Sequence, residues 1–175
     1  MRVRRLRSPR QAATLEELEA VYRRAGAAFE RVAIAIVGDE QLGCDAVQDA
    51  FVLALRSRDR FRRDAPVEAW LWRIVINEAR KRRVREARVI AADPITLDAT
   101  ATPSNGTGDP SQMRALIATL PERQRLTLFL RHYADLDYAT IAQALDVKPG
   151  TVAATLNAAH ASLRTQLEEV HAWEL

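Results

Sequence analysis

The densest charge in the sequence lies at residues 80–85, where five of six side chains are cationic. These five are Arg80, Lys81, Arg82, Arg83 and Arg85. Like charges at this density repel one another, so an anionic partner accounts for the cluster better than a merely solvated surface does. Lys and Arg bind the phosphates of nucleic acids and release the counterions around them. The cluster therefore predicts contacts with a phosphate backbone.

The residues that precede this cluster suit the bases of a nucleic acid. Asn77 offers a hydrogen-bond donor and an acceptor on one amide, which can pair with a base edge. Unpaired bases stack on aromatic rings such as those of Trp70 and Trp72, although we expect at least one of these two to lie in a core.

Nothing in the sequence points to catalysis or to a metal site. Cys44 is the single cysteine, so neither an intrachain disulfide nor a multi-cysteine zinc site can form. His132, His160 and His171 are 28 and 11 residues apart, unlike the ligands of structural metal sites. No phosphate-binding loop, paired carboxylates or nucleophile–base arrangement stands out. We expect a non-enzymatic protein that has no metal or other cofactor.

Charge and composition divide the chain into two parts. Residues 1–90 carry 20 Arg and Lys against 13 Asp and Glu, whereas residues 113–175 carry 6 against 7. The stretch between them has three Asp, no Arg or Lys, and a turn-rich composition that favours a flexible linker. We expect a disordered basic arm at 1–11, a first domain at 12–88, an acidic linker at 89–111 and a second domain at 112–173. No signal-peptide core and no run of 18 apolar residues occurs, so we expect a cytoplasmic protein without membrane insertion.

The first domain has the periodicity of helices. A capping box at Thr14 and Glu17 opens a helix that ends at Gly38-Asp39. Its apolar stripe recurs at alternating spacings of three and four residues: Leu15, Leu18, Tyr22, Ala25, Phe29, Val32 and Ile36. A second helix, at 45–57, directs inward Val47, Ala50, Phe51, Ala54 and Leu55. The apolar run that opens residues 69–87 also fits a buried strand, but its continuation into helix formers without Gly or Pro favours a third helix.

The second domain predicts a helix-turn-helix. Pro121 stands at the first position of a helix whose inner face is formed by Leu126, Phe129, Leu130 and Tyr133. Asp137 then caps a short helix at 138–145. After a turn, a longer helix follows with Val152, Leu156, Ala159 and Leu163 on one face. An ordinary helical hairpin is the alternative for this stretch alone. The expected fold class is all-α, with two small helical domains joined by the flexible acidic linker.

Residues 120–156 resemble region 4 of bacterial sigma factors. In that family a Leu-Pro helix precedes a Tyr-x-x-Ile-Ala and Gly-Thr-Val core. The matching positions here are Leu120, Pro121, Arg123, Gln124, Arg125, Tyr138, Ile141, Ala142, Leu145, Gly150, Thr151, Val152 and Leu156.

Two segments of the first domain resemble sigma region 2. "DAVQDAFVLAL" at 45–55 is similar to the helix that docks on the clamp helices of the RNA polymerase β′ subunit, which implies core-polymerase contacts by Asp45, Gln48 and Asp49. "FRRDAPVEAWLWRIVINEARKRR" at 61–83 is similar to the segment that melts and reads the minus-10 promoter element. The resemblance implies DNA contacts by Arg62, Arg63, Trp70, Arg73, Asn77, Arg80, Lys81, Arg82 and Arg83.

The order of the two regions, with only a linker between them, is similar to that of extracytoplasmic-function (ECF) sigma factors. The resemblance implies binding to core RNA polymerase at the β′ clamp helices and the β flap, binding to promoter DNA, and an anti-sigma factor as a further partner. It also implies that the linker runs near the active-site cleft and RNA exit path of the polymerase. A disordered tether is an equal alternative for the linker.

The recognition helix departs from the family pattern. Where the family has several Lys and Arg after Gly-Thr-Val, this chain has only Ala, Thr, Leu, Asn and His between residues 153 and 160. The residues left for minus-35 contacts are Arg123, Arg125, Lys148, Thr151, Thr155, Asn157 and His160. The sequence therefore predicts a sigma factor with a weak minus-35 reader. A sigma-like interaction protein that reads no minus-35 element is the alternative, and a free-standing helix-turn-helix repressor is disfavoured.

Overall fold

The computed structural model describes residues 12–92 and 110–172, and every regular element in these two ranges is helical. This confirms the expected all-α class. In chain order the elements are α1 (Leu15–Val37), α2 (Glu40–Ser57), the 3-10 turn η1 (Arg58–Arg60), α3 (Val67–Ala92), α4 (Pro110–Thr119), α5 (Glu122–His132), α6 (Tyr138–Leu145) and α7 (Pro149–Ala172). The expected basic arm and the central part of the expected linker lie outside the described residues.

Helices α1, α2 and α3 pack against one another and form the N-terminal unit. The start of α1 has the predicted capping box, in which Thr14 and Glu17 bond to each other's backbone N–H. Gly38 ends α1 with a φ of 89°, a left-handed conformation that glycine adopts without strain. Asp39 caps α2 through the N–H of Leu42, so α2 begins five residues earlier than the predicted position 45.

The core of this unit is built on Phe29 and Trp72, whose ring centroids are 4.3 Å apart. Both side chains are fully buried, which confirms the expectation that one of the two neighbouring tryptophans is a core residue. Three predicted core positions of this unit are instead exposed, Leu15, Tyr22 and Leu55, and so is Tyr133, which was predicted on the inner face of the C-terminal unit. Leu15 and Tyr22 lie at the edge of the stripe on α1. Leu55 follows Ala54, the centre of the buried face of α2, and one residue along a helix turns the side chain by about 100°.

Helices α5, α6 and α7 form the C-terminal unit, with Leu126, Leu130, Ile141, Val152 and Leu156 buried between them. Asp137 accepts a hydrogen bond of 2.6 Å from the N–H of Thr140, and so caps α6 as predicted. Asp146 ends α6 in the left-handed conformation, with a φ of 58°, and begins the turn into α7. This α6–turn–α7 arrangement is the predicted helix-turn-helix.

Two boundaries differ from those predicted. Pro121 is the N-cap of α5 rather than its first helical residue, because its ψ of 140° is extended and Glu122 is the first residue in the helix. Both ends of the expected linker are helical, since α3 continues to Ala92 and α4 begins at Pro110. The run of Arg, Glu and Ala after residue 80 contains no helix breaker, which allows α3 to continue.

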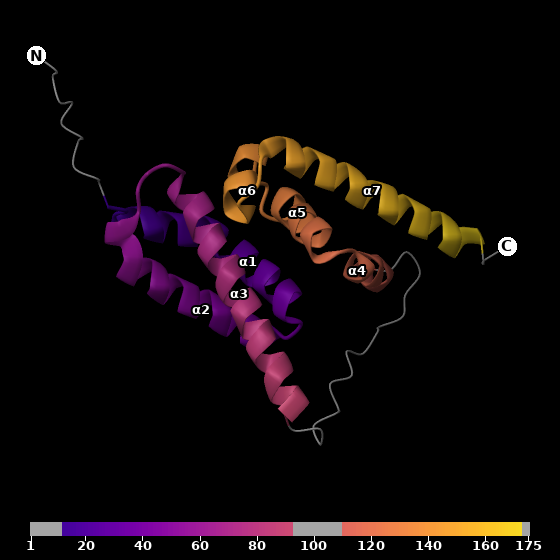
Figure 1. Cartoon of the computed structure of the whole chain (residues 1–175), viewed down its shortest axis with the longest axis horizontal. Coiled ribbons are helices and arrows are strands. Elements are labelled where there is room, and N and C mark those ends of the chain that lie inside the picture. Colours follow the sequence, from indigo (N-terminus) through magenta and orange to yellow (C-terminus); the bar gives the residue numbers. More distant parts are fainter. Residues whose placement is uncertain (1–11, 93–109, 173–175) are drawn as a thin grey trace, which may run out of the picture.

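The two units pack directly on each other. The contacts run between α3 and α6 and between α1 and α5, and Figure 1 shows α6 beside the N-terminal half of α3, whose C-terminal end extends beyond its neighbours. Among the helices of the described ranges, none is long and apolar enough to cross a membrane.

The approach of α1 to α2 depends on Gly43. A Cβ atom added there would lie 2.6 Å from a side-chain carbon of Ile34 and 2.8 Å from two of its backbone atoms. We expect Gly43→Ala to lower the free energy of unfolding by about 1–3 kcal/mol, because backbone cannot move aside as a side chain can. Urea denaturation followed by circular dichroism measures this.

Gly150→Ala is the matched control. Gly150 also lies in a helix, and nothing lies within 4 Å of an added Cβ there. This variant should be neutral or more stable, because Ala favours helix over Gly by up to about 1 kcal/mol. Equal effects of the two substitutions would contradict the close approach.

Candidate nucleic-acid interface

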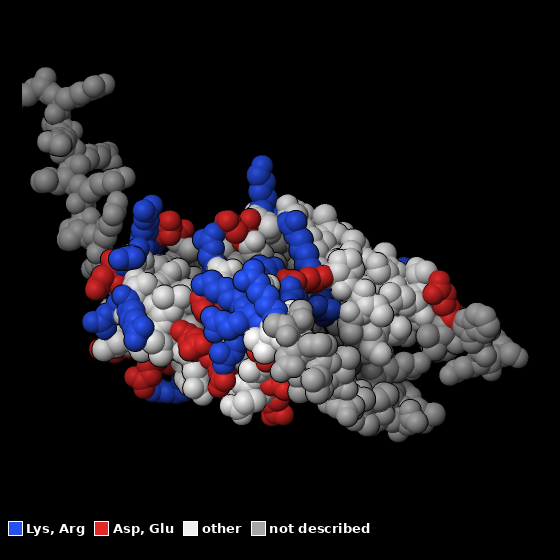
Figure 2. Space-filling view, turned by 60° about the horizontal axis from the view of Figure 1, so that its bottom comes forward, with Lys and Arg blue, Asp and Glu red and all other residues white. Residues whose placement is uncertain are grey.

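The basic cluster lies on the second half of α3. Trp72, Val75, Ile76 and Ala79 are buried, which leaves a stripe of polar residues on the opposite side of the helix. Figure 2 shows Lys and Arg gathered near the middle of one face of the molecule, with Asp and Glu at the edges of the group. The exposed valines Val84 and Val89 lie among these cations along a groove of about 620 Å³.

Two of the predicted DNA-binding arginines, Arg80 and Arg83, are paired with the C-terminal unit. The Glu122 carboxylate accepts a hydrogen bond of 2.7 Å from Nε of Arg80 and one of 2.5 Å from Arg83, one on each oxygen. Partial burial of Glu122 opposes its ionisation, but the hydrogen bonds from the two arginines outweigh this effect and hold its pKa below the usual value. Glu122 is therefore a charged acceptor shared by both cations.

The rest of the predicted set is divided among several partners. Arg73 forms an ion pair of 2.7 Å with Asp146 at the end of α6. Lys81 bonds to Glu78 one turn earlier in the same helix. Arg85 is exposed and has no ion pair among the described residues, and Asn77 is exposed on the same helix. The polar face of α3 is thus directed toward the C-terminal unit along part of its length.

Arg82 is placed differently from its neighbours. It bonds at 2.5 Å to Asp45 and lies 4.0 Å from Asp49, both on α2, and its side chain is only 20% exposed. Its Nε is buried without an acceptor among the described residues. This geometry ties α3 to α2, and the sequence pattern did not distinguish Arg82 from the exposed cations beside it.

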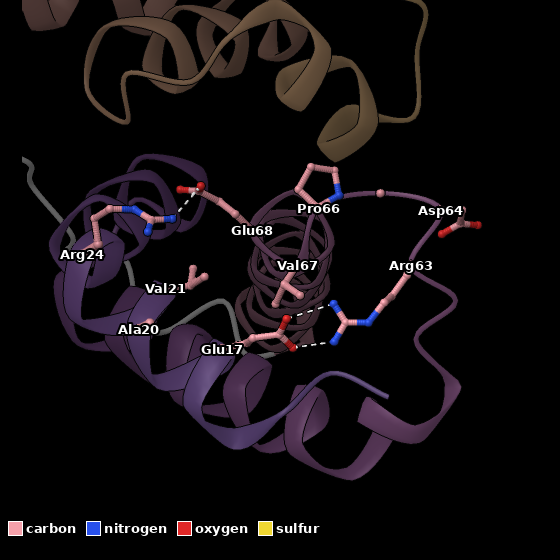
Figure 3. A pocket seen from close by; sticks show the side chains of 10 residues that line it. Glu17, Ala20, Val21, Arg24, Arg63, Asp64, Pro66, Val67 and Glu68 are labelled. Atoms are coloured by element: carbon pink, nitrogen blue, oxygen red, sulfur yellow. Dashed lines mark hydrogen bonds and ion pairs between the residues drawn. The ribbon is translucent and has the colours of Figure 1, made fainter. Parts of the chain in front are cut away.

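The loop before α3 lines a groove of about 740 Å³ together with the start of α1 (Figure 3). Arg63 has a φ of 52°, unusual for a residue with a side chain. Its guanidinium makes two hydrogen bonds to Glu17, of 2.9 and 2.8 Å, and one to the carbonyl of Ala12. These contacts hold the loop, while Arg62 is exposed. Trp70 is half-buried, and its ring centroid lies 5.0 Å from that of Phe61.

A second surface lies on α2. Gln48 and Asp49 are exposed and Asp45 is half-buried by its bond to Arg82. The exposed side chains of Val52 and Leu53 continue this surface by one turn, and neither residue was predicted from the sequence to belong to it. Val52 lies four residues after Gln48 and three residues after Asp49, a spacing that places the three side chains on the same face of α2.

The predicted minus-35 residues do not form a cationic face. Lys148 lies in the turn before α7, and the Thr155 hydroxyl donates back to the carbonyl of Thr151. Asn157 is exposed. His160 is exposed with its ring centroid 5.7 Å from that of His132.

The two arginines of α5 that belong to the predicted minus-35 set lie in different surroundings. Arg123 is exposed. Arg125 donates to the carbonyl of Ala118 and lines an interdomain groove with Arg31 of α1. The groove has a volume of about 650 Å³.

A helix-turn-helix unit packed on a unit with a basic helix combines two features that are common in nucleic-acid-binding proteins. Residues 21–89 match the family model of sigma-70 region 2, and residues 111–163 match that of sigma-70 region 4. Together the matches cover well over half of the chain. The protein belongs to the sigma-70 family and is of the ECF type.

Curated relatives agree with this assignment. The chain is 32% identical over 123 residues to the ECF RNA polymerase sigma-E factor of Escherichia coli K12, an alignment that spans 62% of this chain and 64% of the relative. The sigma-E factor of Haemophilus influenzae is 28% identical over 139 residues, spanning 71% of this chain and 74% of that protein. The chain thus aligns with slightly less than two thirds of the length of the E. coli relative.

Solved structures share the fold. The sigma factor RpoE from Bartonella quintana, in complex with the anti-sigma factor NepR, has a TM-score of 0.67 at 22% identity, covering 87% of this chain and 95% of that one. CnrH, in complex with the cytosolic domain of CnrY, has a TM-score of 0.65 at 24% identity, covering 90% and 91%.

The Arg63–Glu17 pair yields a prediction about the loop at 61–66. Glu17→Gln preserves the capping box, since Gln serves there as Glu does, but removes the charge that holds Arg63. We expect hydrogen exchange of the loop amides to rise about two- to fivefold, the effect of a half-exposed ion pair. Exchange measured by mass spectrometry at neutral pH tests this. Glu19→Gln, which disrupts only a pair within α1, should leave the loop unchanged.

The same pair makes the protection of this loop depend on pH. The hydrogen bonds from Arg63, followed by the one from the Thr14 backbone, lower the pKa of Glu17. A carboxylate with a lowered pKa stabilises the fold above its unfolded pKa, about 4.3, and this contribution is lost as the pH falls through the folded value. The difference between wild type and Glu17→Gln should therefore vanish in acid. A difference that persists there would contradict the ion pair as its cause.

Proposed function

We propose that this protein is a sigma factor, a non-catalytic subunit that binds core RNA polymerase, places it on promoters and assists strand opening. The observation that supports this most strongly is the presence of both sigma-70 regions in one chain, in the family order, with the densest positive charge on α3 of region 2. In this function α2 contacts the polymerase, α3 and its preceding loop contact the minus-10 element, and the helix-turn-helix lies toward the minus-35 element.

The α2 surface has the composition of a protein-binding site. Gln48 and Asp49 lie beside the exposed apolar side chains of Val52 and Leu53, and an apolar centre with a polar rim is typical of protein interfaces. We assign this surface to the β′ clamp helices of the polymerase. Because Arg82 neutralises part of the charge of Asp45, Asp49 is the freer acid on the surface.

The face of α3 suits a single DNA strand. Arg73, Asn77 and Arg80 lie at spacings of four and three residues on the side away from Trp72, so they follow one line along the helix. Cations on such a line contact successive phosphates, and the adjoining loop groove between Glu17 and Glu68 can accommodate an unstacked base. Arg82 and Arg63 act in this assignment as positioning residues, which hold α3 and the loop.

The helix-turn-helix has the fold but little of the charge of a DNA reader. Between Lys148 and Arg164, α7 and its turn carry no Lys or Arg, and each absent arginine–guanine contact lowers discrimination by about 1–3 kcal/mol. We infer a weak contribution of the minus-35 element to promoter choice. The same observation favours the second candidate function, a sigma-like protein that binds polymerase or a regulator without reading this element. The β flap and an anti-sigma factor are further proposed partners, the latter supported by the complexes of the two structural relatives.

Transcription reconstituted with core polymerase tests this function. We expect initiation from a promoter that has both elements, and scrambling the minus-10 element should abolish it, because α3 carries the DNA-binding charge. Scrambling the minus-35 element should reduce initiation by about tenfold or less, the effect of losing one weak contact set.

Two controls make the result decisive. Core polymerase alone measures initiation that does not require the protein, and Asp49→Lys with Val52→Glu should abolish the effect of the added protein by disrupting its α2 surface. Binding to core without initiation at any promoter would refute the sigma function and favour the interaction protein. Loss of initiation on scrambling minus-35 alone would refute the weak-reader assignment.

A further inference from the structure

Two histidines that are 28 residues apart in the sequence meet on the surface of the C-terminal unit. His132 lies in the last turn of α5 and His160 lies in α7. The centroids of their rings are 5.7 Å apart, and the ring planes are inclined by 52°. Both side chains are exposed, so the pair is open to small ions from the solvent.

The helix-turn-helix holds the two histidines beside each other. Helices α5 and α7 are in direct contact, and Figure 1 shows α7 running past α5. Leu130, two residues before His132, and Ala159, next to His160, are fully buried. The core therefore fixes the backbone at both histidines. Spacing along the chain does not reveal the pair, because α6 and the turn after it lie between the two residues.

The separation of the rings suits one shared metal ion. Imidazole nitrogens bind zinc at about 2.0–2.1 Å, so two imidazoles on one ion place their ring centroids roughly 5–6 Å apart. Imidazole is a ligand suited to zinc, copper and nickel, whereas magnesium and calcium prefer oxygen. Within residues 12–92 and 110–172, no group of three or more His, Cys, Asp or Glu could hold a metal ion. Water must therefore supply the remaining ligands.

The charges around the pair are compatible with a bound cation. The last turn of α5, which contains His132, is the negative end of the helix dipole. The preceding Arg131 is engaged by Asp135 and by the carbonyl of Leu136. On α7, Arg164 and Glu168 follow His160 along a groove of about 430 Å³, and their opposite charges offset each other.

We propose that His132 and His160 form a site for one divalent transition-metal ion, of the class of Zn²⁺, Ni²⁺ and Cu²⁺, which ties the end of α5 to α7. The bound ion links two helices of the helix-turn-helix and adds two positive charges to α7, whose residues 149–163 include no Lys or Arg. The site departs from the expectation, drawn from spacing along the sequence, of a chain without a metal. It requires only the fold of the C-terminal unit and is independent of the sigma function.

The test uses the full chain without a polyhistidine tag, in a Cys44→Ser background that removes the thiol as a competing ligand. Isothermal titration calorimetry with Zn²⁺, Ni²⁺ and Cu²⁺ measures binding, and Mg²⁺ is the control ion. We expect one ion per chain, with Cu²⁺ bound most tightly and no binding of Mg²⁺. Saturating Zn²⁺ should raise the Tm measured by circular dichroism, because it binds the folded state selectively.

His132→Ala and His160→Ala should each lower the affinity for the metal at least about tenfold, since the second imidazole binds as an intramolecular ligand. Each should also abolish the rise in Tm with Zn²⁺, while the Tm without metal stays close to that of the parent because both side chains are exposed. His171→Ala is the matched control. His171 follows His160 by 11 residues, about 16 Å along the helix axis, and its loss should change neither measurement.

Pulsed electron paramagnetic resonance of the Cu²⁺-loaded chain counts the bound imidazoles directly. We expect two in the parent chain and one in each single variant. Equal affinities of the parent and the two single variants, or one imidazole in the parent, would overturn the site and show adventitious binding by single side chains. A stoichiometry of one ion for two chains would also overturn it, because the proposed ligands belong to one chain. None of these outcomes bears on promoter opening, so the site and the sigma function can fail separately.

Discussion

The packing of Trp72 against Phe29 is the interaction on which the rest of the structure depends. A fully buried Trp–Phe pair at 4.3 Å contributes several kcal/mol, since removing a buried aromatic side chain costs about 3–5 kcal/mol. It fixes the rotation of α3 about its own axis. With Trp72 directed inward, Arg73, Asn77 and Arg80 must face outward, and Arg82 must turn toward α2.

The fixed rotation of α3 gives its cations distinct roles within a few residues. Arg82 is bonded to Asp45 and is structural, whereas Arg80 and Arg83 extend to the surface and meet Glu122. A uniform run of positive charge in the sequence is therefore not a uniform surface. Two cations of the surface that results, Arg80 and Arg83, pair with Glu122 of the C-terminal unit.

Local patterns predicted much of the fold. The capping box at Thr14 and the cap at Asp137 each involve residues three positions apart, and the short helix at 138–145 spans eight residues; the structure confirms all three. Tyr22 and Leu55 were misplaced because periodicity defines an apolar side of a helix but not how far its neighbours cover that side. The resemblance to sigma regions 2 and 4 rests on short sequence motifs, which can be recognised without knowledge of the tertiary structure.

The part of the site that the sequence did not predict is long-range. Glu122 and Arg80 are 42 residues apart and lie in different units, and the sequence pattern places Glu122 only in the first turn of a helix, where an acid is common for local reasons. The pairing of Arg82 with Asp45 spans 37 residues. Tertiary packing determines both pairings. The packing of one helix or domain against another leaves no periodic signal in the sequence of either partner.

In the proposed function α3, rather than the recognition helix α7, supplies the charge that binds promoter DNA. The most direct test is the salt dependence of promoter binding by the reconstituted holoenzyme. Each phosphate contact with a single strand contributes about 0.7 to the slope of log K against log salt concentration, so Arg80→Ala with Arg83→Ala should reduce the slope by about 1.4. Lys148→Ala with Arg164→Ala should change it little. An unchanged slope in the α3 variant, with a reduced slope in the α7 variant, would contradict the assignment of DNA binding to α3.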